Sequence, residues 1–290
     1  GRRDLNPGRR RGSSQVSLSG DIQGLVSEFE EYCIVVQRLA KSVRRDYRCI
    51  AKRSLRLTKG VVSYESVKGY LATYLSKAPR AYNNQLKGLR AFIGKFLERP
   101  DIIERFKKAH VPYYEPDVPT DEQVKQGFYG LTDDIEKALY LFYATSGVRK
   151  SEALNLNMNT DVDFELRCVK SKHDTRSKKA GITFYNGECE KYLKGYMNSR
   201  RHTSDLLFVI GSKRFKRMWN KASEKAGFRI TAQALRIWHS TTLGELMVPD
   251  RYVDVFHGRA PRSVLAKYYT SKETQKVKRI YDKADLKVLG

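Results

Sequence analysis

The sequence predicts a mainly helical protein with a small β-sheet, built as a helical bundle followed by an α+β domain. Three observations support this fold class. A chain of 290 residues is long enough for two domains that each bury a core of their own. Apolar residues recur at helical spacing through the first third of the chain. Alternation typical of short strands follows later, beyond a proline-rich stretch at residues 110–120.

Residues 1–20 hold five arginines among Gly, Ser, Asn and Pro, with almost no apolar side chains. Such a segment buries too little apolar surface to offset the entropy that it would lose on ordering. We therefore expect a flexible basic arm, which either follows phosphates or stays solvated.

Residues 21–110 carry three apolar stripes at helical spacing. A basic helix is predicted at residues 43–57, between the first stripe and the second. Because each stripe recurs every three or four residues on one face, its aromatic side chains are expected in a core. The segment is therefore predicted to be a bundle of about four helices. The stripes consist of Ile22, Leu25, Val26, Phe29, Cys33, Val36 and Leu39, of Tyr64, Val67, Tyr70, Leu71, Tyr74 and Leu75, and of Tyr82, Leu86, Leu89, Phe92, Ile93, Phe96 and Leu97.

Residues 111–118 are predicted to be an interdomain linker, because the prolines in and beside them favour extended backbone. The second domain is then expected to span residues 119–290, with a C-terminal tail from residue 271. Two interpretations of this basic tail stay open: it docks on a neighbouring copy of the chain, or it is a frayed end.

The second domain shows both kinds of periodicity. Thr132 and Asp133 are candidate caps of a helix that stops at Gly147. Alternation around residues 164–168 and 182–184 predicts a hairpin of two strands with a basic turn. A further helix is expected near residues 213–226 and closes at Gly227.

The charge balance indicates a nucleic-acid partner. Lys and Arg total 56 against 32 Asp and Glu, a formal charge of +24. Such a surplus is self-repelling unless a polyanion neutralises it, and DNA does so with release of its condensed counterions. The basic side chains between the apolar stripes are the candidate DNA contacts. Charge alone does not separate an enzyme that acts on DNA from a protein that only binds it.

Cysteine and histidine spacing argues against a metal site. The four cysteines lie far apart without a CxxC pair, and the five histidines show no close ligand spacing. No run of apolar residues is long enough for a membrane span, and no secretion signal opens the chain. We expect a soluble protein of the cytoplasm.

Two arginines are predicted at the openings of helices. In the segment ATSGVRKSEAL, residues 144–154, Arg149 follows a turn glycine by two positions. The segment ITAQALR, residues 230–236, ends on Arg236, which lies 87 residues later (236 minus 149). In order and context these segments resemble the two arginine boxes of the tyrosine recombinases, T-G-hydrophobic-R-x-S-E-L and T-P-H-x-L-R. The resemblance implies that Arg149 and Arg236 bind the scissile phosphate.

The second box departs from the family at two positions. Gln233 stands at the usual His or Lys, and Ile237 replaces the His that commonly follows the arginine. Because an amide is neither a general acid nor a general base, any role of Gln233 is a hydrogen bond to phosphate.

The third element, FHGRAPRSVLAKYYT at residues 256–270, resembles the family's G-H, short helix and Tyr ending. Its form is closer to integrases of archaeal viruses and plasmids, in which an arginine can replace the histidine. Arg259 is then the third phosphate ligand, with His257 as the alternative. Tyr269, ten residues after Arg259 and followed by Thr, is the preferred nucleophile. Tyr268, nine residues after Arg259, is the alternative.

The family also carries a catalytic lysine in a hairpin turn between the two boxes. The turn here is VKSKHDTRSKK, residues 169–179, and Lys172 matches best, through the Ser-Lys step after the first strand. Lys170, Lys178 and Lys179 stay open as alternatives.

The resemblance implies a site-specific DNA recombinase, or integrase, that works through a 3′-phosphotyrosyl intermediate without ATP, metal or cofactor. The bundle would be its core-binding domain and residues 119–290 its catalytic domain. The implied partners are double-stranded DNA with att-like sites and three further copies of the chain, and the implied role is integration of a viral or plasmid genome. A type IB topoisomerase, a non-catalytic DNA-binding protein and a metal-dependent nuclease are the rival functions.

Overall fold

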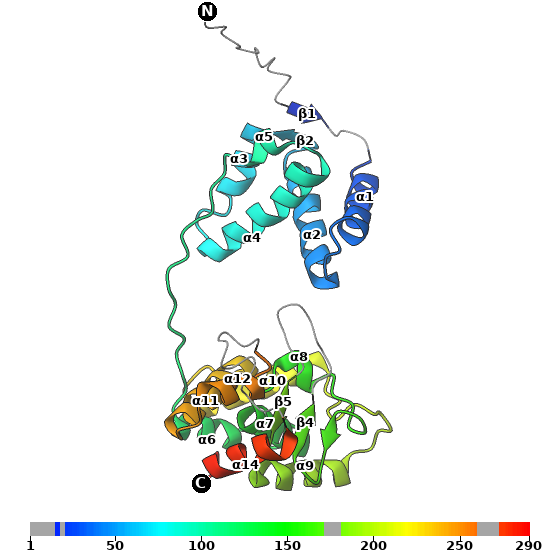
Figure 1. The fold of residues 1–290 in the computed structure, drawn as a ribbon. Helices are drawn as coiled ribbons and strands as arrows, with labels where there is room; N and C mark the ends of the chain where they lie inside the picture. Colours follow the sequence, from blue (N-terminus) through cyan, green and yellow to red (C-terminus); the bar gives the residue numbers. More distant parts are fainter. Residues whose placement is uncertain (1–14, 18–20, 171–180, 260–272) are drawn as a thin grey trace, which may run out of the picture. The chain divides into compact units, whose positions relative to one another are not determined.

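A computed structural model describes residues 15–17, 21–170, 181–259 and 273–290. The chain divides into two compact units, Gly1–Tyr114 and Glu115–Gly290. The division falls inside the segment predicted as a linker. Figure 1 shows a helical first unit and a second unit in which helices surround a small sheet, which is the predicted fold class.

The first unit is a bundle whose helices pack on a shared apolar core. Phe29, Leu55, Leu86 and Phe92 are fully buried there, and the rings of Phe29 and Phe92 meet edge to face with centroids 5.0 Å apart. The long apolar stripe at residues 82–97 forms an α-helix that continues as a π-helix rather than one uniform helix. The elements are α1 (Ile22–Val35), α2 (Lys41–Leu57), β2 (Val61–Ser63), α3 (Tyr64–Ala72), α4 (Pro79–Leu89), η1 (Arg90–Phe96) and α5 (Pro100–Ile103).

One part of the predicted flexible arm is ordered. Residues Gln15–Ser17 form β1, which pairs antiparallel with β2 through Gln15 opposite Ser63. Backbone hydrogen bonds to β2 order these three residues despite a composition that favours disorder. The expectation of a flexible arm over all of residues 1–20 was therefore wrong at this strand.

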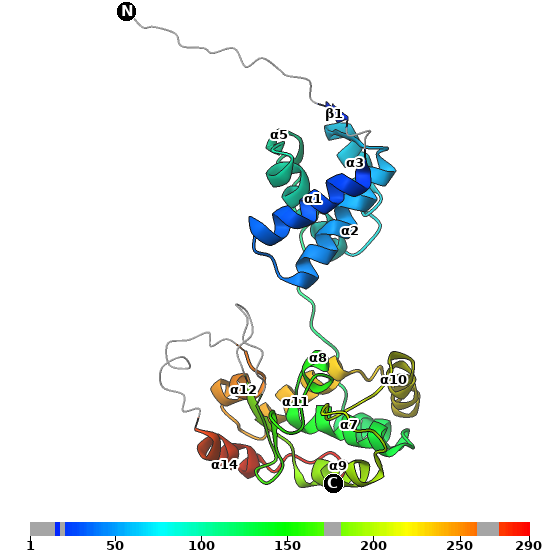
Figure 2. The same ribbon diagram turned by 90° about the vertical axis from the view of Figure 1, so that its right-hand side faces the viewer.

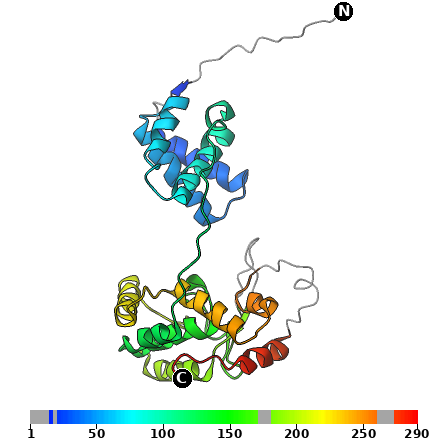
Figure 3. The same cartoon turned by 90° about the vertical axis from the view of Figure 1, so that its left-hand side faces the viewer.

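The second unit is built around one buried helix. Eleven of the thirteen residues of α7 are buried, and α6, α9 and α11 pack against it. Figure 3 shows α11 running along α7. The elements are α6 (Asp121–Tyr129), α7 (Asp134–Ser146), α8 (Lys150–Ala153), β3 (Val162–Asp163), β4 (Cys168–Lys170), β5 (Ile182–Phe184), α9 (Gly187–Ser199), α10 (Ser212–Ala226), α11 (Ala232–Glu245), α12 (Asp250–Phe256) and α14 (Thr274–Ala284).

Two glycines end helices as the sequence predicts. Gly147 closes α7 and Gly227 closes α10, both in the left-handed conformation with φ near +60°. The predicted hairpin consists of β4 and β5, with Cys168 opposite Phe184. Its first strand begins later than expected, because residues 164–167 form a turn and β4 starts at Cys168. A third strand, β3, pairs with β4 on its other side, so the described sheet has three strands instead of two.

The C-terminal tail packs on its own unit. Val277, Tyr281 and Leu286 are buried in the core, and the Tyr281 hydroxyl donates to the Thr145 carbonyl at 2.6 Å. The end of the chain is held by backbone donation from Val288 to Glu188 at 2.8 Å. Figure 2 shows α14 beside α12, with the chain end passing toward α9. The described part of the tail is therefore ordered, so the expectation of a frayed end was wrong there, whereas docking on a neighbouring copy stays a prediction.

Candidate active site

Arg149 is held at the start of α8 by both its backbone and its side chain. Its backbone nitrogen donates to Glu152 Oε2 at 2.9 Å, and its Nη1 bonds Glu152 Oε1 at 2.6 Å. Its Nη2 donates to the carbonyl of Gly258 at 3.2 Å. The left-handed turn at Gly147 directs the chain from the end of α7 into this position. The guanidinium is therefore fixed, and its side chain keeps 21% of its surface exposed.

Arg236 lies one turn into α11 and is nearly buried. Its Nη1 donates to the carbonyl of Gly147, and its Nη2 donates to the carbonyl of His257 at 2.5 Å. Burial, the charge of Arg149 and the charge of Arg259 lower the pKa of Arg236, while Glu152 opposes the shift. The guanidinium therefore lies in a region of excess positive charge.

Arg259 follows Gly258, whose φ of +53° turns the chain out of α12. It is exposed and makes an ion pair with Asp254 at 3.3 Å. Its charge contributes to the lowered pKa of Arg236. The structure thus brings Arg149, Arg236 and Arg259 together, and we call these three residues the arginine cluster.

The alternative third ligand, His257, is 1% exposed. Its ring stacks on that of His239, and His257 Nε2 lies 2.9 Å from His239 Nδ1. His257 therefore points into the core, whereas Arg259 is the accessible side chain of the two. Sequence reasoning missed this histidine pair, because no spacing pattern connects two histidines on different helices.

Gln233 is exposed in the first turn of α11, and Thr231 caps that helix by accepting from the backbone of Ala234. Gln233 borders a cavity of about 590 Å³ between α8, α10 and α11. Phe215 and Trp219 form part of its apolar wall, and Lys150, Lys216 and Arg229 are its cations. None of the described residues that line the cavity is acidic.

The remaining predicted residues, Lys172 and Tyr269, lie outside the described residues. The same holds for the alternatives Lys178, Lys179 and Tyr268. Lys170, the other alternative, ends β4 and is exposed.

Two of the described ends that border these segments, Gly181 and Arg259, lie at the arginine cluster. A Cβ on Gly181, which precedes β5, would come within 3.0 Å of the Gly258 Cα. Gly181 and Gly258 also line one small pocket together with Arg149 and Glu152.

Chemically, the arginine cluster suits a phosphodiester. Planar guanidinium groups donate paired hydrogen bonds to phosphate oxygens, and a bound anion relieves the repulsion among three neighbouring cations. Across the described residues, no group of His, Cys, Asp and Glu side chains is placed to hold a metal ion. No helix in the described ranges is long and apolar enough to cross a bilayer.

The sequence is similar to a known family and to one of its characterised members. Residues 130–276, half of the chain, match the model of the phage integrase family. The tyrosine recombinase XerA of Pyrococcus horikoshii is 26% identical over 220 residues, which cover 71% of this chain and 74% of the relative.

Among solved structures, lambda integrase bound as a dimer to a COC′ core site is similar with a TM-score of 0.64 and 11% identity, over 86% of this chain and 97% of that one. The Tn1549 transposon integrase in complex with transposon right end DNA is similar with a TM-score of 0.63 and 13% identity, over 88% and 97% of the two chains. These likenesses show a shared fold. With the family match over half of its residues, the chain belongs to the phage integrase family, the tyrosine recombinases.

Proposed function

We propose that this chain is a site-specific DNA recombinase that cuts and rejoins strands through Tyr269. The observation that carries the proposal is the convergence of Arg149, Arg236 and Arg259, each from a different segment of the second unit. Backbone carbonyls orient two of these guanidinium groups. Such fixed cations are what a phosphoryl transfer requires, because the transition state gains charge on the non-bridging oxygens.

In the proposed reaction the Tyr269 phenol loses its proton to solvent, and its oxygen attacks the scissile phosphorus. The bond from phosphorus to the 5′ oxygen breaks as the 3′-phosphotyrosyl bond forms. A free phenol has a pKa near 10, so its ionisation at pH 7 costs roughly 4 kcal/mol, which the arginine cluster recovers in the transition state. Lys172 gives a proton to the departing 5′ oxygen. Gln233 donates a hydrogen bond to a phosphate oxygen.

Resealing reverses these steps. The 5′ hydroxyl of a partner strand attacks the phosphotyrosine, its proton returns to the lysine, and Tyr269 leaves. The energy of the phosphodiester is kept in the protein-DNA bond, so no ATP is consumed.

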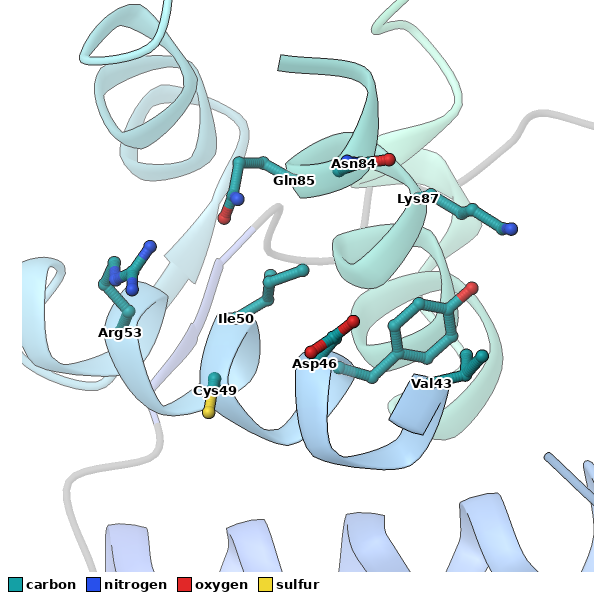
Figure 4. Close-up of a pocket in the computed structure, with 9 residues that line it drawn as sticks. Val43, Asp46, Cys49, Ile50, Arg53, Asn84, Gln85 and Lys87 are labelled. Carbon is teal, nitrogen blue, oxygen red and sulfur yellow. The ribbon is translucent and has the colours of Figure 1, made fainter. Parts of the chain in front are cut away.

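Both units are proposed to contact duplex DNA. In the first unit, α2 carries seven Lys and Arg against one Asp, and its buried residues, such as Ile50 and Leu55, are apolar or small. Between α2 and α4 lies a groove of about 340 Å³, with Arg53 and Lys87 at its two ends (Figure 4). The solved structure of Tn1549 integrase is a complex with transposon right end DNA, that of lambda integrase is bound to a COC′ core site, and that of XerH is bound to its difH substrate, which supports the proposal.

At the level of the cell, we propose integration of a viral or plasmid genome into a host chromosome, with four copies of the chain joining two att-like duplexes. The archaeal character of the third motif supports this role. The recombinase would then act in the cytoplasm, at the nucleoid.

A covalent selection followed by strand exchange tests the function. The full chain is incubated with nicked duplexes of randomised core sequence, protein-DNA adducts that survive denaturant are isolated, and the selected duplex is then used as substrate. We expect joining between two selected duplexes, and unchanged activity in EDTA. Relaxation of supercoils without joining would indicate a topoisomerase, EDTA-sensitive cutting a nuclease, and salt-sensitive binding without an adduct a non-catalytic protein. Each of these three results would overturn the proposal.

A further inference from the structure

We propose that His239 and His257 form a positioning pair that sets the Arg236 guanidinium against the scissile phosphate. The inference rests on the proposed function, because it assigns these histidines a role through a phosphate ligand. Neither histidine is proposed to touch DNA, since they are 0% and 1% exposed.

The pair joins two elements of the second unit. His239 lies on α11, one turn beyond Arg236, and His257 follows α12. Their nitrogens are 2.9 Å apart, and the ring centroids are 5.1 Å apart at an interplanar angle of 26°. One hydrogen bond between stacked rings therefore fixes the turn after α12 to the helix that carries Arg236.

Both acceptors of Arg236 depend on this contact. One acceptor is the carbonyl of His257 itself. The other is the carbonyl of Gly147, whose Cα lies against both rings, since a Cβ there would come 2.6 Å from His239 Nδ1 and 2.8 Å from His257 Nε2. A displaced imidazole would therefore move one carbonyl directly and remove the support of the other.

The pair is neutral in the folded protein. Burial first, and then the charge of Arg236, lower the pKa of His239 to about 3, with a smaller lowering from Arg259 and an opposing hydrogen bond to the Thr145 backbone carbonyl. Burial, His239 and all three members of the arginine cluster also lower the pKa of His257. A protonated ring would add another cation beside Arg236. The pair therefore offers hydrogen bonding without charge.

Because the pair needs a hydrogen bond without charge, each ring has a conservative substitution. In His239→Asn the amide stands where Nδ1 stands, and in His257→Gln the amide stands where Nε2 stands. An amide donates or accepts and carries no charge, so the double variant can rebuild the contact. His239→Leu and His257→Leu fill the space but remove the hydrogen bond.

The test measures the rate of covalent adduct formation at saturating selected duplex, and separately the affinity for uncut duplex. We expect each Leu variant to lower the rate about tenfold or more, because small misplacements of a positioning group are costly, while affinity stays within about threefold. The Asn/Gln double variant is expected to recover most of the rate. Tyr196→Phe, which removes a partly buried hydrogen bond to His202, is the matched control for a lost histidine contact and should react like wild type.

A second substrate shows whether the lower rate of the Leu variants is caused by a displaced Arg236. A methylphosphonate at the scissile position is uncharged, so its cleavage depends less on a cation at the non-bridging oxygens. The deficit of His239→Leu should therefore shrink on this substrate. Three results would overturn the positioning role of the pair and leave the proposed function standing. These are an equal deficit on both substrates, a double variant as slow as the Leu variants, and Leu variants as fast as wild type. Failure of the wild type to form any adduct would overturn the recombinase itself.

Discussion

Arg149 Nη2 donates a hydrogen bond to the backbone carbonyl of Gly258 at 3.2 Å, across 109 residues of sequence. Arg236 Nη2 donates to the neighbouring carbonyl, that of His257. Two arginines therefore hold the backbone from which the third, Arg259, projects. Because they share this support, substitutions within the arginine cluster are expected to be non-additive.

Replacing Arg149 by lysine tests the geometry of the cluster. The lysine ammonium keeps the charge. It cannot, however, hydrogen-bond both Glu152 and the Gly258 carbonyl and still offer paired donors to phosphate, as the planar guanidinium can. We expect Arg149→Lys to slow covalent adduct formation by roughly 100-fold or more, with DNA affinity changed only a few-fold. The matched control is Arg167→Lys, because Arg167 pairs with Glu190 outside the cluster. Equal rates for Arg149→Lys and wild type would contradict the role of the fork.

Stability of the second unit is expected to fall in acid because of the histidine pair. The pKa of His239 is about 3 in the folded protein and 6.5 in the unfolded chain. Below pH 6.5 the unfolded chain therefore binds more protons than the folded protein does. The free energy of unfolding should therefore drop by about 1.4 kcal/mol per pH unit for this histidine, between pH 6.5 and pH 3. His257, whose pKa is also lowered, adds a loss that begins at the same pH.

Both tryptophans, Trp219 and Trp238, lie in the second unit, so denaturant titrations followed by their fluorescence measure this loss. The His239→Asn, His257→Gln double variant should show a flatter dependence on pH. A slope equal to that of wild type would exclude the pair as the source.

Tyr281→Phe tests the docking of the tail. The substitution removes the hydroxyl that donates to the buried Thr145 carbonyl at 2.6 Å. We expect a loss of about 0.5–1.5 kcal/mol in the free energy of unfolding of the second unit. Tyr129→Phe, at a half-exposed ring of the same unit, should change it little. Equal stabilities for the two variants would contradict the docking.

The groove of the first unit is expected to contribute phosphate contacts. Arg53→Gln together with Lys87→Gln removes the cations at its two ends. If each binds one phosphate, the slope of log affinity against log salt should become shallower by roughly 0.9 per contact. Lys95→Gln, an exposed lysine on η1 outside the groove, is the control. An unchanged slope in the double variant would place the DNA elsewhere on this unit.

The sequence could predict features that depend on local rules. Gly147 and Gly227 were identifiable as helix ends because a left-handed residue is needed there. The positions of Arg149 and Arg236 at helix openings followed from the same kind of pattern. The fold class could be predicted because helical spacing of apolar residues reports burial directly.

Features that depend on long-range contacts could not be predicted. The His239 and His257 rings meet only when α11 and α12 pack, and neither ring carries a spacing signal. The tail looked like a basic end because its few apolar residues gave no indication that Thr145 and Glu188 would hold it. The order at Gln15–Ser17 comes from pairing with β2, far along the chain.

The most direct test of the account is covalent trapping on the selected nicked duplex with wild type, Tyr269→Phe and Tyr268→Phe. A nick beside the cleavage point lets a short fragment diffuse away, so the phosphotyrosyl adduct accumulates and is counted on a denaturing gel. We predict adduct with wild type and with Tyr268→Phe, and none with Tyr269→Phe. Loss of the adduct in Tyr268→Phe alone would identify Tyr268 as the nucleophile. Absence of the adduct with wild type would contradict the proposal that the chain is a recombinase.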